Sequence, residues 1–365
     1  GSFQDQSFIA TVTGLVGAAQ SGTPADAGHA SANPGQTLTL QGNGLDVTTD
    51  IVFPIIDSNG TRSERTVRPS TVNEAGTELQ VTVPFDAVSG SVRAVGDRNA
   101  TALPLQIIPV ITGYDVQSVA SDGSSATLYL YGSGFVEGQG SEYRFGTQAI
   151  LDGGAASGPD VQAYWWQSQA QVTLSVPLVD GVLGPISVKT AGGVSAAFSL
   201  GLSGLEATAL SGTPADAGQA SANPGQAVTL IGTGLSTATD VLFRFTDSLG
   251  VARMALLNPA SASGDGTSAT LVVPGYANGV ASLEVLGAST ALSLQIVPTL
   301  RGYDLSGGTL TLTGQGFVEA GSTYRFAGAD LADTAAASGP DVQYSGETGE
   351  NGGVSLADPA HGFGP

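Results

Sequence analysis

Two histidines, His29 and His361, are the only imidazole groups in the chain and therefore the first candidates for acid–base chemistry. General-base catalysis needs an imidazole held beside a nucleophile and oriented by a third group. His29 lies in a Gly-, Ser- and Ala-rich stretch, and a second copy of that stretch carries Gln219 at the same place. No pair of acids stands on neighbouring strands beside an aromatic platform, as a glycosidase would need. The sequence therefore predicts a protein that is not an enzyme.

The second candidate site is aromatic and would bind a ligand rather than transform it. Tyr164, Trp165 and Trp166 are consecutive, and stacked aromatic rings are a common platform for sugars. Adjacent residues of a strand point to opposite faces, so we expect one tryptophan in the core and the other at the surface. The related stretch later in the chain keeps Tyr344 but has no tryptophan. A carbohydrate-binding module is therefore the alternative function.

Acidic residues that recur at corresponding places of the chain form the candidate metal site. Loop carboxylates and backbone carbonyls suit a hard cation such as Ca²⁺, which would stiffen the joints between domains. No EF-hand loop is present, and surface charge that keeps the protein soluble is the competing interpretation. The six acids lie in three repeated motifs: Asp26 and Asp216 in "TPADAG", Asp115 and Asp304 in "GYD", and Asp160 and Asp341 in "SGPDVQ".

The charge balance excludes several classes of partner. The chain has 11 basic and 31 acidic residues and a net charge of −20, which repels nucleic acid and anionic lipid. No apolar run is long enough to span a membrane, so we expect neither nucleic-acid binding nor membrane insertion. There is no cysteine, hence no disulfide and no thiolate ligand. Lys189 alternates with Ile186 and Val188 and is therefore predicted to face solvent. It is the only lysine, so intramolecular isopeptide bonds cannot recur from module to module.

A long internal repeat organises these residues. The stretch Ser21–Gln36 returns as Ser211–Gln226 and is identical at fifteen of sixteen positions. Later motifs return at an offset that falls to 181 residues, so the deletions must lie in loops. Each long repeat divides into two related halves. Each half runs through a strand ending in a G-x-G turn, an aromatic-centred strand, an alternating strand ending in Val-Pro, a Gly-led strand and a closing strand.

The local pattern is that of short β-strands. In Gln171–Pro177, Val172, Leu174 and Val176 alternate with polar residues, as in a strand with one buried face. The 53 glycines and 18 prolines favour many strands joined by tight turns. Several strands at intervals of about ten residues indicate immunoglobulin-like sandwiches of about 90–100 residues. The predicted fold is all-β, with tandem sandwiches arranged end to end.

The order of motifs "PGQ-VTL-GTGL … V-F … VP … G-V … L-P" resembles the IPT/TIG family of immunoglobulin-like domains. Members of that family occur in cell-surface receptors, in some transcription factors and, as tandem arrays, in bacterial adhesins. A transcription factor would need a basic face, so the acidic chain resembles the bacterial surface branch more closely. The resemblance implies four modules, which we name A1 (16–109), B1 (110–205), A2 (206–298) and B2 (299–365).

The two ends of the chain yield a further expectation. Phe8–Leu15 aligns with Phe198–Leu205 and is predicted to be the last strand of a preceding domain, covering residues 1–15. Module B2 is predicted to be incomplete and to lack its last two strands. An open sandwich edge accepts another strand, so the segment Phe8, Ile9, Ala10, Thr11 and Val12 is the predicted strand donor to a neighbouring copy.

Taken together, these features predict a stalk or spacer of a long bacterial secreted or cell-surface adhesin or fibre. Its expected location is extracellular. Its expected partners are neighbouring copies of the same repeat, joined head to tail, and surface glycans or host or biofilm components. Calcium is the one cofactor that the sequence suggests.

Overall fold

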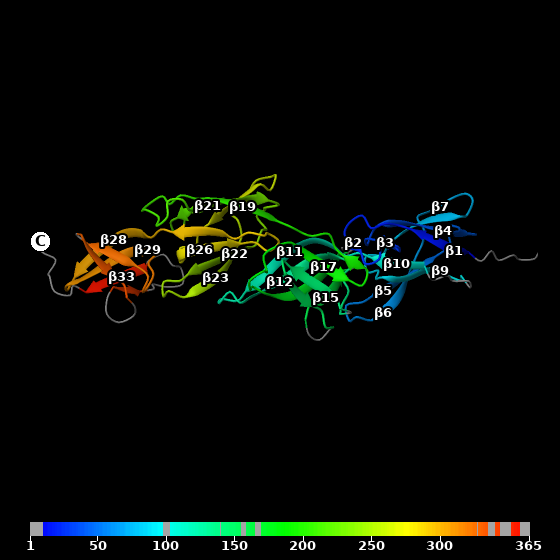
Figure 1. The fold of residues 1–365 in the computed structure, drawn as a ribbon, viewed down its shortest axis with the longest axis horizontal. Coiled ribbons are helices and arrows are strands. Elements are labelled where there is room, and N and C mark those ends of the chain that lie inside the picture. Colours follow the sequence, from blue (N-terminus) through cyan, green and yellow to red (C-terminus); the bar gives the residue numbers. More distant parts are fainter. Residues whose placement is uncertain are drawn as a thin grey trace, which may run out of the picture. The chain divides into compact units, whose positions relative to one another are not determined.

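A computed structural model describes residues 10–97, 103–138, 140–154, 158–164, 169–326, 328–334, 340–343 and 352–357. The described residues form β-strands and turns, which confirms the predicted all-β fold of tandem sandwiches (Figure 1). They include no helix, and so none long and apolar enough to cross a membrane. The chain divides into two compact units, which are described separately. Unit 1 holds Gly1–Gln117, Thr127–Pro177 and Pro185–Ser199; unit 2 holds Ser118–Ala126, Leu178–Gly184 and Leu200–Pro365.

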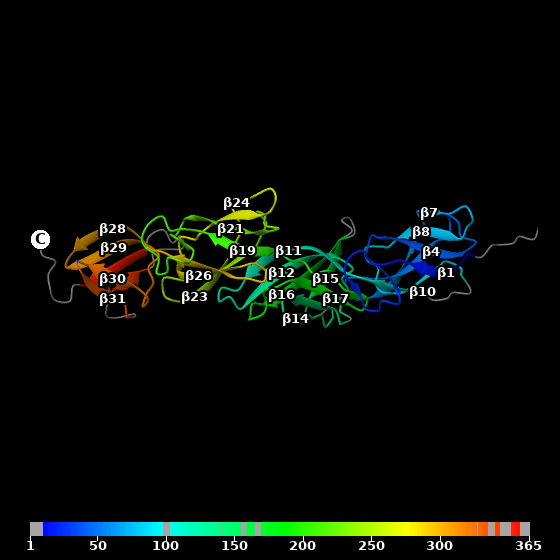
Figure 2. The same ribbon diagram turned by 45° about the horizontal axis from the view of Figure 1, so that its top comes forward.

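Module A1 is a sandwich of a four-stranded and a five-stranded sheet. Alternation sets the buried face: in β4, Leu38 and Leu40 are buried between more exposed neighbours. Figure 2 labels β1, β4, β8 and β7, which form the first sheet in that order. The second sheet has the order β3-β10-β9-β5-β6. The strands are β1 (Thr11–Val16), β3 (Ala30–Ala32), β4 (Thr37–Asn43), β5 (Ile51–Ile56), β6 (Arg62–Val67), β7 (Thr71–Val72), β8 (Glu78–Thr82), β9 (Gly90–Ala94) and β10 (Leu103–Ile107).

The position of β1 corrects the prediction for the described part of residues 1–15, which begins at Ala10. β1 pairs antiparallel with β4 of module A1, with Thr11 opposite Asn43 and Val12 opposite Gly42. Val12 is buried in the core of A1, and Ala10 packs against that core. The segment is therefore the first strand of A1 and not the last strand of a preceding domain. Thr11 and Val12 are not a free strand donor, and Phe8 and Ile9 lie outside the described residues.

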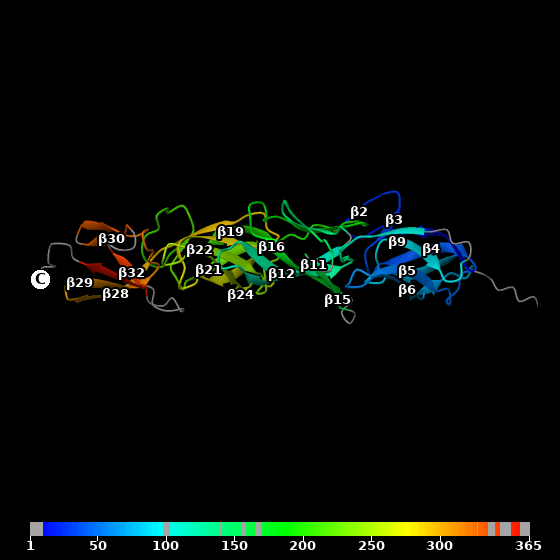
Figure 3. The same cartoon turned by 90° about the horizontal axis from the view of Figure 1, so that it is seen from below.

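Module A2 repeats this architecture in unit 2. Its sheets have the orders β19-β21-β25-β24 and β20-β27-β26-β22-β23, and Figure 3 shows β19, β21, β22 and β24. β19 pairs with β21 just as β1 pairs with β4, so A2 begins at Gly201 rather than at residue 206. The strands are β19 (Gly201–Glu206), β20 (Ser221–Ala222), β21 (Ala227–Thr233), β22 (Val241–Thr246), β23 (Ala252–Leu257), β24 (Ser261–Ala262), β25 (Ser268–Val272), β26 (Asn278–Glu284) and β27 (Leu292–Ile296).

Module B1 has a four-stranded sheet, β11-β12-β16-β15, and a five-stranded sheet, β14-β13-β17-β18-β2. The predicted alternation in β16 is confirmed, because Val172, Leu174 and Val176 are all buried. The fifth strand of the second sheet, β2 (Thr23–Pro24), comes from module A1. The other strands are β11 (Val110–Val119), β12 (Ser125–Ser133), β13 (Glu142–Phe145), β14 (Gln148–Leu151), β15 (Asp160–Tyr164), β16 (Gln169–Pro177), β17 (Ile186–Thr190) and β18 (Gly193–Val194).

Module B2 repeats the first sheet of B1 but shows a smaller second sheet among the described residues. Its sheets are β28-β29-β33-β32 and β30-β31. Among its described residues, the buried core contains Leu310, Leu312, Phe317, Tyr324 and Val342. The strands are β28 (Thr299–Ser306), β29 (Thr309–Gln315), β30 (Thr323–Phe326), β31 (Ala329–Ala332), β32 (Asp341–Gln343) and β33 (Gly352–Ala357).

Candidate functional site

The repeated stretch at residues 21–36 is a loop whose form is fixed by polar side chains rather than by a core. Asn33 donates from Nδ2 to the carbonyl oxygens of Ser21 and Ile108, both at 3.0 Å, and its Oδ1 accepts from the Ser21 N–H at 2.9 Å. Gln36 donates to the Ala18 carbonyl at 2.7 Å and accepts from the Asn33 N–H at 3.1 Å. Such bonds satisfy backbone groups that no sheet pairs. They require these particular amide side chains.

A third amide holds the loop from the end of the module. Gln106 accepts from the Asp26 N–H at 2.7 Å and donates to the Asp26 carbonyl at 2.6 Å. We call Asn33, Gln36 and Gln106 the amide clamp. The second loop, at residues 211–226, has the same clamp, formed by Asn223, Gln226 and Gln295. Retention of these bonds gives a physical reason why the two stretches are almost identical.

The clamped loop of A1 presents a strand to module B1. β2 pairs antiparallel with β18, with Pro24 opposite Gly193 and Thr23 opposite Val194. The Ala25 N–H adds a hydrogen bond to the Gly192 carbonyl at 3.0 Å. The edge of the B1 sheet is therefore covered by a neighbouring module, which removes a site of unwanted strand pairing. We call this contact, with the apolar cluster described below, the A1–B1 joint.

Glycine is required where the two modules touch. A Cβ atom on Gly192 would lie 2.2 Å from the Ile107 carbonyl oxygen and 2.3 Å from the Ser89 hydroxyl. Gly193 has φ +143°, and a Cβ atom there would lie 2.2 Å from the Thr23 carbonyl oxygen. No larger residue fits without moving backbone. The "AGG" of Ala191–Gly193 is thus part of the joint, although the sequence alone predicts only a turn there.

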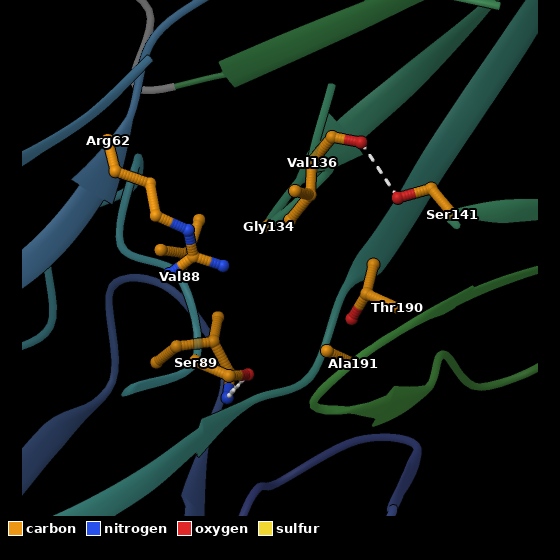
Figure 4. A pocket seen from close by; sticks show the side chains of 9 residues that line it. Arg62, Val88, Ser89, Gly134, Val136, Ser141, Thr190 and Ala191 are labelled. Carbon is orange, nitrogen blue, oxygen red and sulfur yellow. Dashed lines mark hydrogen bonds between the residues drawn. The ribbon is translucent and has the colours of Figure 1, made fainter. Parts of the chain in front are cut away.

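Buried apolar contacts complete the A1–B1 joint. Ile56 and Val88 of A1 and Val136 of B1 form one buried cluster. Beside it is a cavity of about 20 Å³, which Figure 4 shows between Arg62, Val88 and Ser89 on one side and Val136, Ser141 and Thr190 on the other. That volume is close to the space that one water molecule needs. The joint is closely packed, and this cavity cannot hold a substrate.

Buried carboxylates lie on the B1 side of the joint. Glu137 is 2% exposed; its Oε2 accepts from the Val161 N–H at 2.7 Å, whereas its buried Oε1 has no hydrogen-bond partner. Asp152, 3% exposed, accepts from the N–H groups of Gly138 and Gly154. Burial raises the pKa of Glu137, and the charges of Asp152 and Asp160 raise it further against the lowering effect of the Val161 N–H. A negative charge at Glu137 therefore destabilises the fold.

We expect Glu137→Gln to stabilise the protein at pH 7 by about 1 kcal/mol, because the amide oxygen can still accept from Val161 while the buried charge is removed. The pKa of Glu137 is higher in the folded protein than in the unfolded chain, where it is about 4.5. Below that pH Glu137 is protonated in both states and carries no buried charge. As the pH rises through the folded pKa, Glu137 becomes charged in the folded protein and the free energy of unfolding falls. The difference between variant and wild type should therefore vanish on acidification. Urea unfolding at pH 7 and pH 4 measures it. The exposed Glu74→Gln is the control; equal effects of the two would contradict the prediction.

In unit 2, Arg244 connects module A2 to two loops. It donates to Glu284 Oε1 at 3.0 Å, to the Gly123 carbonyl at 3.2 Å and to the Leu178 carbonyl at 3.3 Å. The Met254 N–H adds a bond to the Ser121 carbonyl at 3.2 Å. The position of Arg244 corresponds to Pro54 in A1, so this contact is specific to A2.

Arg244→Ala should therefore destabilise unit 2 by about 1–2 kcal/mol, since three acceptors lose a charged donor. Arg68→Ala is the matched control. The Arg68 side chain is 65% exposed and forms an exposed ion pair with Asp50, so its loss should cost about 0–0.5 kcal/mol. Thermal unfolding of both variants compares them, and a larger loss for Arg68→Ala would refute the assignment.

The six acids that the sequence nominates as calcium ligands each have their own local surroundings. Asp26 accepts from the Gly28 N–H and lies 2.9 Å from His29 Nδ1, and Asp216 accepts from the Gly218 N–H. Asp115 and Asp160 interact with Gln117 and Gln162, two residues away. Across the part of the chain that is described, no group of three or more His, Cys, Asp or Glu side chains could hold a metal ion. The remaining two acids, Asp304 and Asp341, are exposed.

Calcium binding stays a prediction of the sequence, and it has a direct test. If calcium binds the folded state, adding it to protein treated with a chelator raises the Tm, because binding stabilises the native state by RT ln(1 + c/Kd), where c is the free calcium concentration. If the predicted calcium binding holds, calcium should raise the Tm by several degrees more than magnesium does at the same concentration. Equal Tm values with the two ions would contradict the prediction.

The remaining sequence candidates are placed as follows. Tyr164 ends β15, while Trp165 and Trp166 lie outside the described residues, so the sugar platform stays a prediction. Lys189 is exposed and stands opposite Glu142 in the β13–β17 pair, as its alternation predicted. His29 is paired with Asp26 near the clamped loop, and His361 lies outside the described residues. The residues that form the A1–B1 joint were not predicted. The feature of the sequence that could have indicated this joint is the near identity of residues 21–36 and 211–226.

No family model matches the chain, and no curated protein matches it. One similar solved structure is the plexin A4 full extracellular region, domains 1 to 10. It is 9% identical over 98% of this chain and 30% of that chain, with a TM-score of 0.21. Another is the tetra-tandem repeat in the extending region of a large adhesion protein, 16% identical over 77% of this chain and 76% of that chain, with a TM-score of 0.17. TM-scores of this size do not establish a shared arrangement of modules.

Proposed function

We propose that the chain is a structural spacer segment of a longer extracellular protein, in which A and B modules are joined directly to one another. The observation that carries the proposal is the A1–B1 joint: the clamped loop of one module completes the sheet of the next. A flexible linker between modules would make no such contact. A stalk needs joints that resist bending, and a backbone-paired joint with required glycines meets that need.

The hollows of the described surface also favour a structural function. A second cavity at the joint, lined by Asp86 and Glu137 among others, again measures about 20 Å³. The larger hollows, of about 260 and 310 Å³, lie on module A2 and at the end of A1 and are open to solvent. Small-molecule sites usually measure about 300–1,000 Å³ and enclose most of the ligand. We therefore base the proposed function on the A1–B1 joint and not on these hollows.

An extracellular location, on a bacterial surface, is part of the same proposal. A cysteine-free chain with a net charge of −20 and repeated sandwiches suits a long, soluble surface protein. Neighbouring repeats of the same kind would be its main partners, and any adhesive contact with glycans would be made by loops.

The stiffness of the A1–B1 joint is the property to measure. Because the chain has no cysteine, two spin labels can be placed on the full chain at will. Val47 in A1 and Leu151 in B1 are 63% and 66% exposed and suit labelling. A single narrow distance distribution between the labels would support the spacer. A distribution much broader than that of a control pair within A1, Val16 and Val95, would show a hinge and overturn the proposal.

A further inference from the structure

Two buried carboxylates, one from each module, line the same small cavity of the A1–B1 joint. Asp86 of A1 is 8% exposed; Arg65 donates to its Oδ2 at 3.0 Å, whereas its Oδ1 has no hydrogen-bond partner among the described residues. Glu137 of B1 leaves its Oε1 without a partner in the same way. Both side chains line the cavity of about 20 Å³ that also borders Asp57 and Ser58. Buried acceptors that no donor reaches cost free energy, and a charge on them raises that cost.

Glu137 also touches module A1 directly. A Cβ atom on Gly60, in the turn between β5 and β6, would lie 3.9 Å from Glu137 Cγ and 3.7 Å from the Glu137 carbonyl oxygen, which is ordinary van der Waals contact. The preceding residue, Val136, is buried in one cluster with Ile56 and Val88 of A1. Part of the burial of Glu137 is therefore provided by A1, so an opening of the joint would bring water to the carboxyl group.

The titratable and charged groups around Glu137 leave a charge on it uncompensated. On the B1 side they are Tyr143 of β13, Asp152 after β14 and Asp160 of β15. On the A1 side they are Asp57 and Asp86, which line the cavity, and Arg65, which pairs with Asp86. Burial raises the pKa of Glu137, and the charges of Asp152 and Asp160 raise it further, against the lowering effect of the Val161 N–H. The protonated form of Glu137 therefore suits this place better than the charged form.

We propose that Glu137 is a proton-binding site within the A1–B1 joint, and that the joint opens less readily when this site is protonated. The closed joint keeps the carboxyl group from water, whereas the open joint hydrates it, so the closed state binds the proton more firmly. The inference rests on the proposed function, because it concerns the joint on which the spacer depends.

Linkage gives the direction of the pH effect. Below the pKa that Glu137 has in the open joint, the group is protonated in both states and the joint is at its firmest. As the pH rises through the higher pKa of the closed joint, the closed state acquires a buried charge and opening becomes easier. Each unit of difference between the two pKa values corresponds to about tenfold in the equilibrium between closed and open joint. The spacer would thus be stiffest in acidic surroundings.

Hydrogen exchange of the Ala25 amide in the full chain measures the opening, because this N–H donates across the joint to the Gly192 carbonyl at 3.0 Å. Dividing the intrinsic rate of a free amide by the measured rate gives a protection factor at each pH, which removes the pH dependence of the exchange chemistry itself. From pH 7 to pH 4.5 we expect the protection of Ala25 to rise about fivefold, since a pKa difference of one unit gives at most about tenfold. The amides of β4, which pairs within A1, should change less. Equal protection of Ala25 at the two pH values would overturn the proposal.

Two variants assign the response to Glu137. Glu137→Gln has no group to titrate, so its Ala25 protection should already be high at pH 7 and should change less than about twofold on acidification. The exposed Glu74→Gln is the matched control and should keep the fivefold rise of the wild type. A wild-type rise that persists in Glu137→Gln would overturn the proposal and place the proton elsewhere. A failure of the spacer would appear separately, as a broad distance distribution between the labels on A1 and B1 at every pH.

Discussion

Replacing Gly192 with alanine should destabilise unit 1 by about 3 kcal/mol, a large effect for a single added methyl group. The added Cβ atom would lie 2.2 Å from the Ile107 carbonyl oxygen and 2.3 Å from the Ser89 hydroxyl. The first of these is backbone, so relief requires the β17–β18 hairpin to move away from A1. The β2–β18 pair and the Ala25 hydrogen bond would then be lost together.

Urea unfolding of the Gly192→Ala chain measures this loss, and spin labels at residues 47 and 151 should report a broadened distance distribution. Gly113→Ala is the matched control, because a Cβ atom there would have no atom within 4 Å. Its stability should be unchanged or slightly raised, since alanine restricts the unfolded chain more than glycine does. If both variants unfolded at the same urea concentration, the close contact at Gly192 would not exist in solution.

Replacing Asn33 with alanine should cost about 2–3 kcal/mol. Asn33 is 6% exposed and makes three hydrogen bonds to backbone groups, which alanine would leave without partners in a buried place. The substitution also frees the loop that carries β2. We therefore expect the Ala25 amide, which is bonded to Gly192, to exchange its hydrogen much faster than in the wild type.

An exposed asparagine of the same module provides the comparison. Asn59 lies in the turn after β5 and its side chain is exposed, so Asn59→Ala should change stability by less than about 0.5 kcal/mol. The corresponding Asn223→Ala should reproduce the loss of stability in unit 2, because Asn223 makes the same three bonds. A loss at Asn33 no larger than at Asn59 would mean that the amide clamp is not what holds the loop.

The fold could be read from the sequence because its signal is local. Alternation in Gln171–Pro177 predicted β16, and the repeated motifs predicted a paired arrangement of sandwiches that the strand orders confirm. The error at the start of the chain has a specific cause. Phe8–Leu15 aligns with Phe198–Leu205, but Gly201–Leu205 is itself the opening of A2, since β19 pairs with β21. The alignment was correct, whereas the assignment of that strand to the closing edge of a module was not.

The A1–B1 joint could not be predicted from local sequence patterns. β2 and β18 have two residues each, too few for any periodic pattern, and they lie about 170 residues apart in the chain. Two of the three acceptors of Arg244 are likewise backbone carbonyls, which no residue type in the sequence can reveal. The sequence did show that one polar loop is nearly identical in its two copies, residues 21–36 and 211–226, without showing why. Loop sequences usually vary, so a loop that is nearly identical in two copies is a sign of a contact with another part of the protein.

The pairing of β2 with β18 also sets an order of events during synthesis. Every strand of the two A1 sheets lies between Thr11 and Ile107, so A1 can fold and fix its clamped loop as soon as that length has left the ribosome. β18 ends at Val194, and at ordinary rates of translation it emerges on the order of ten seconds later. During that interval the exposed edge of Thr23–Pro24 serves as a finished template for the last strand of B1. Module A1 would thereby act as an assembly platform for B1, the module translated after it.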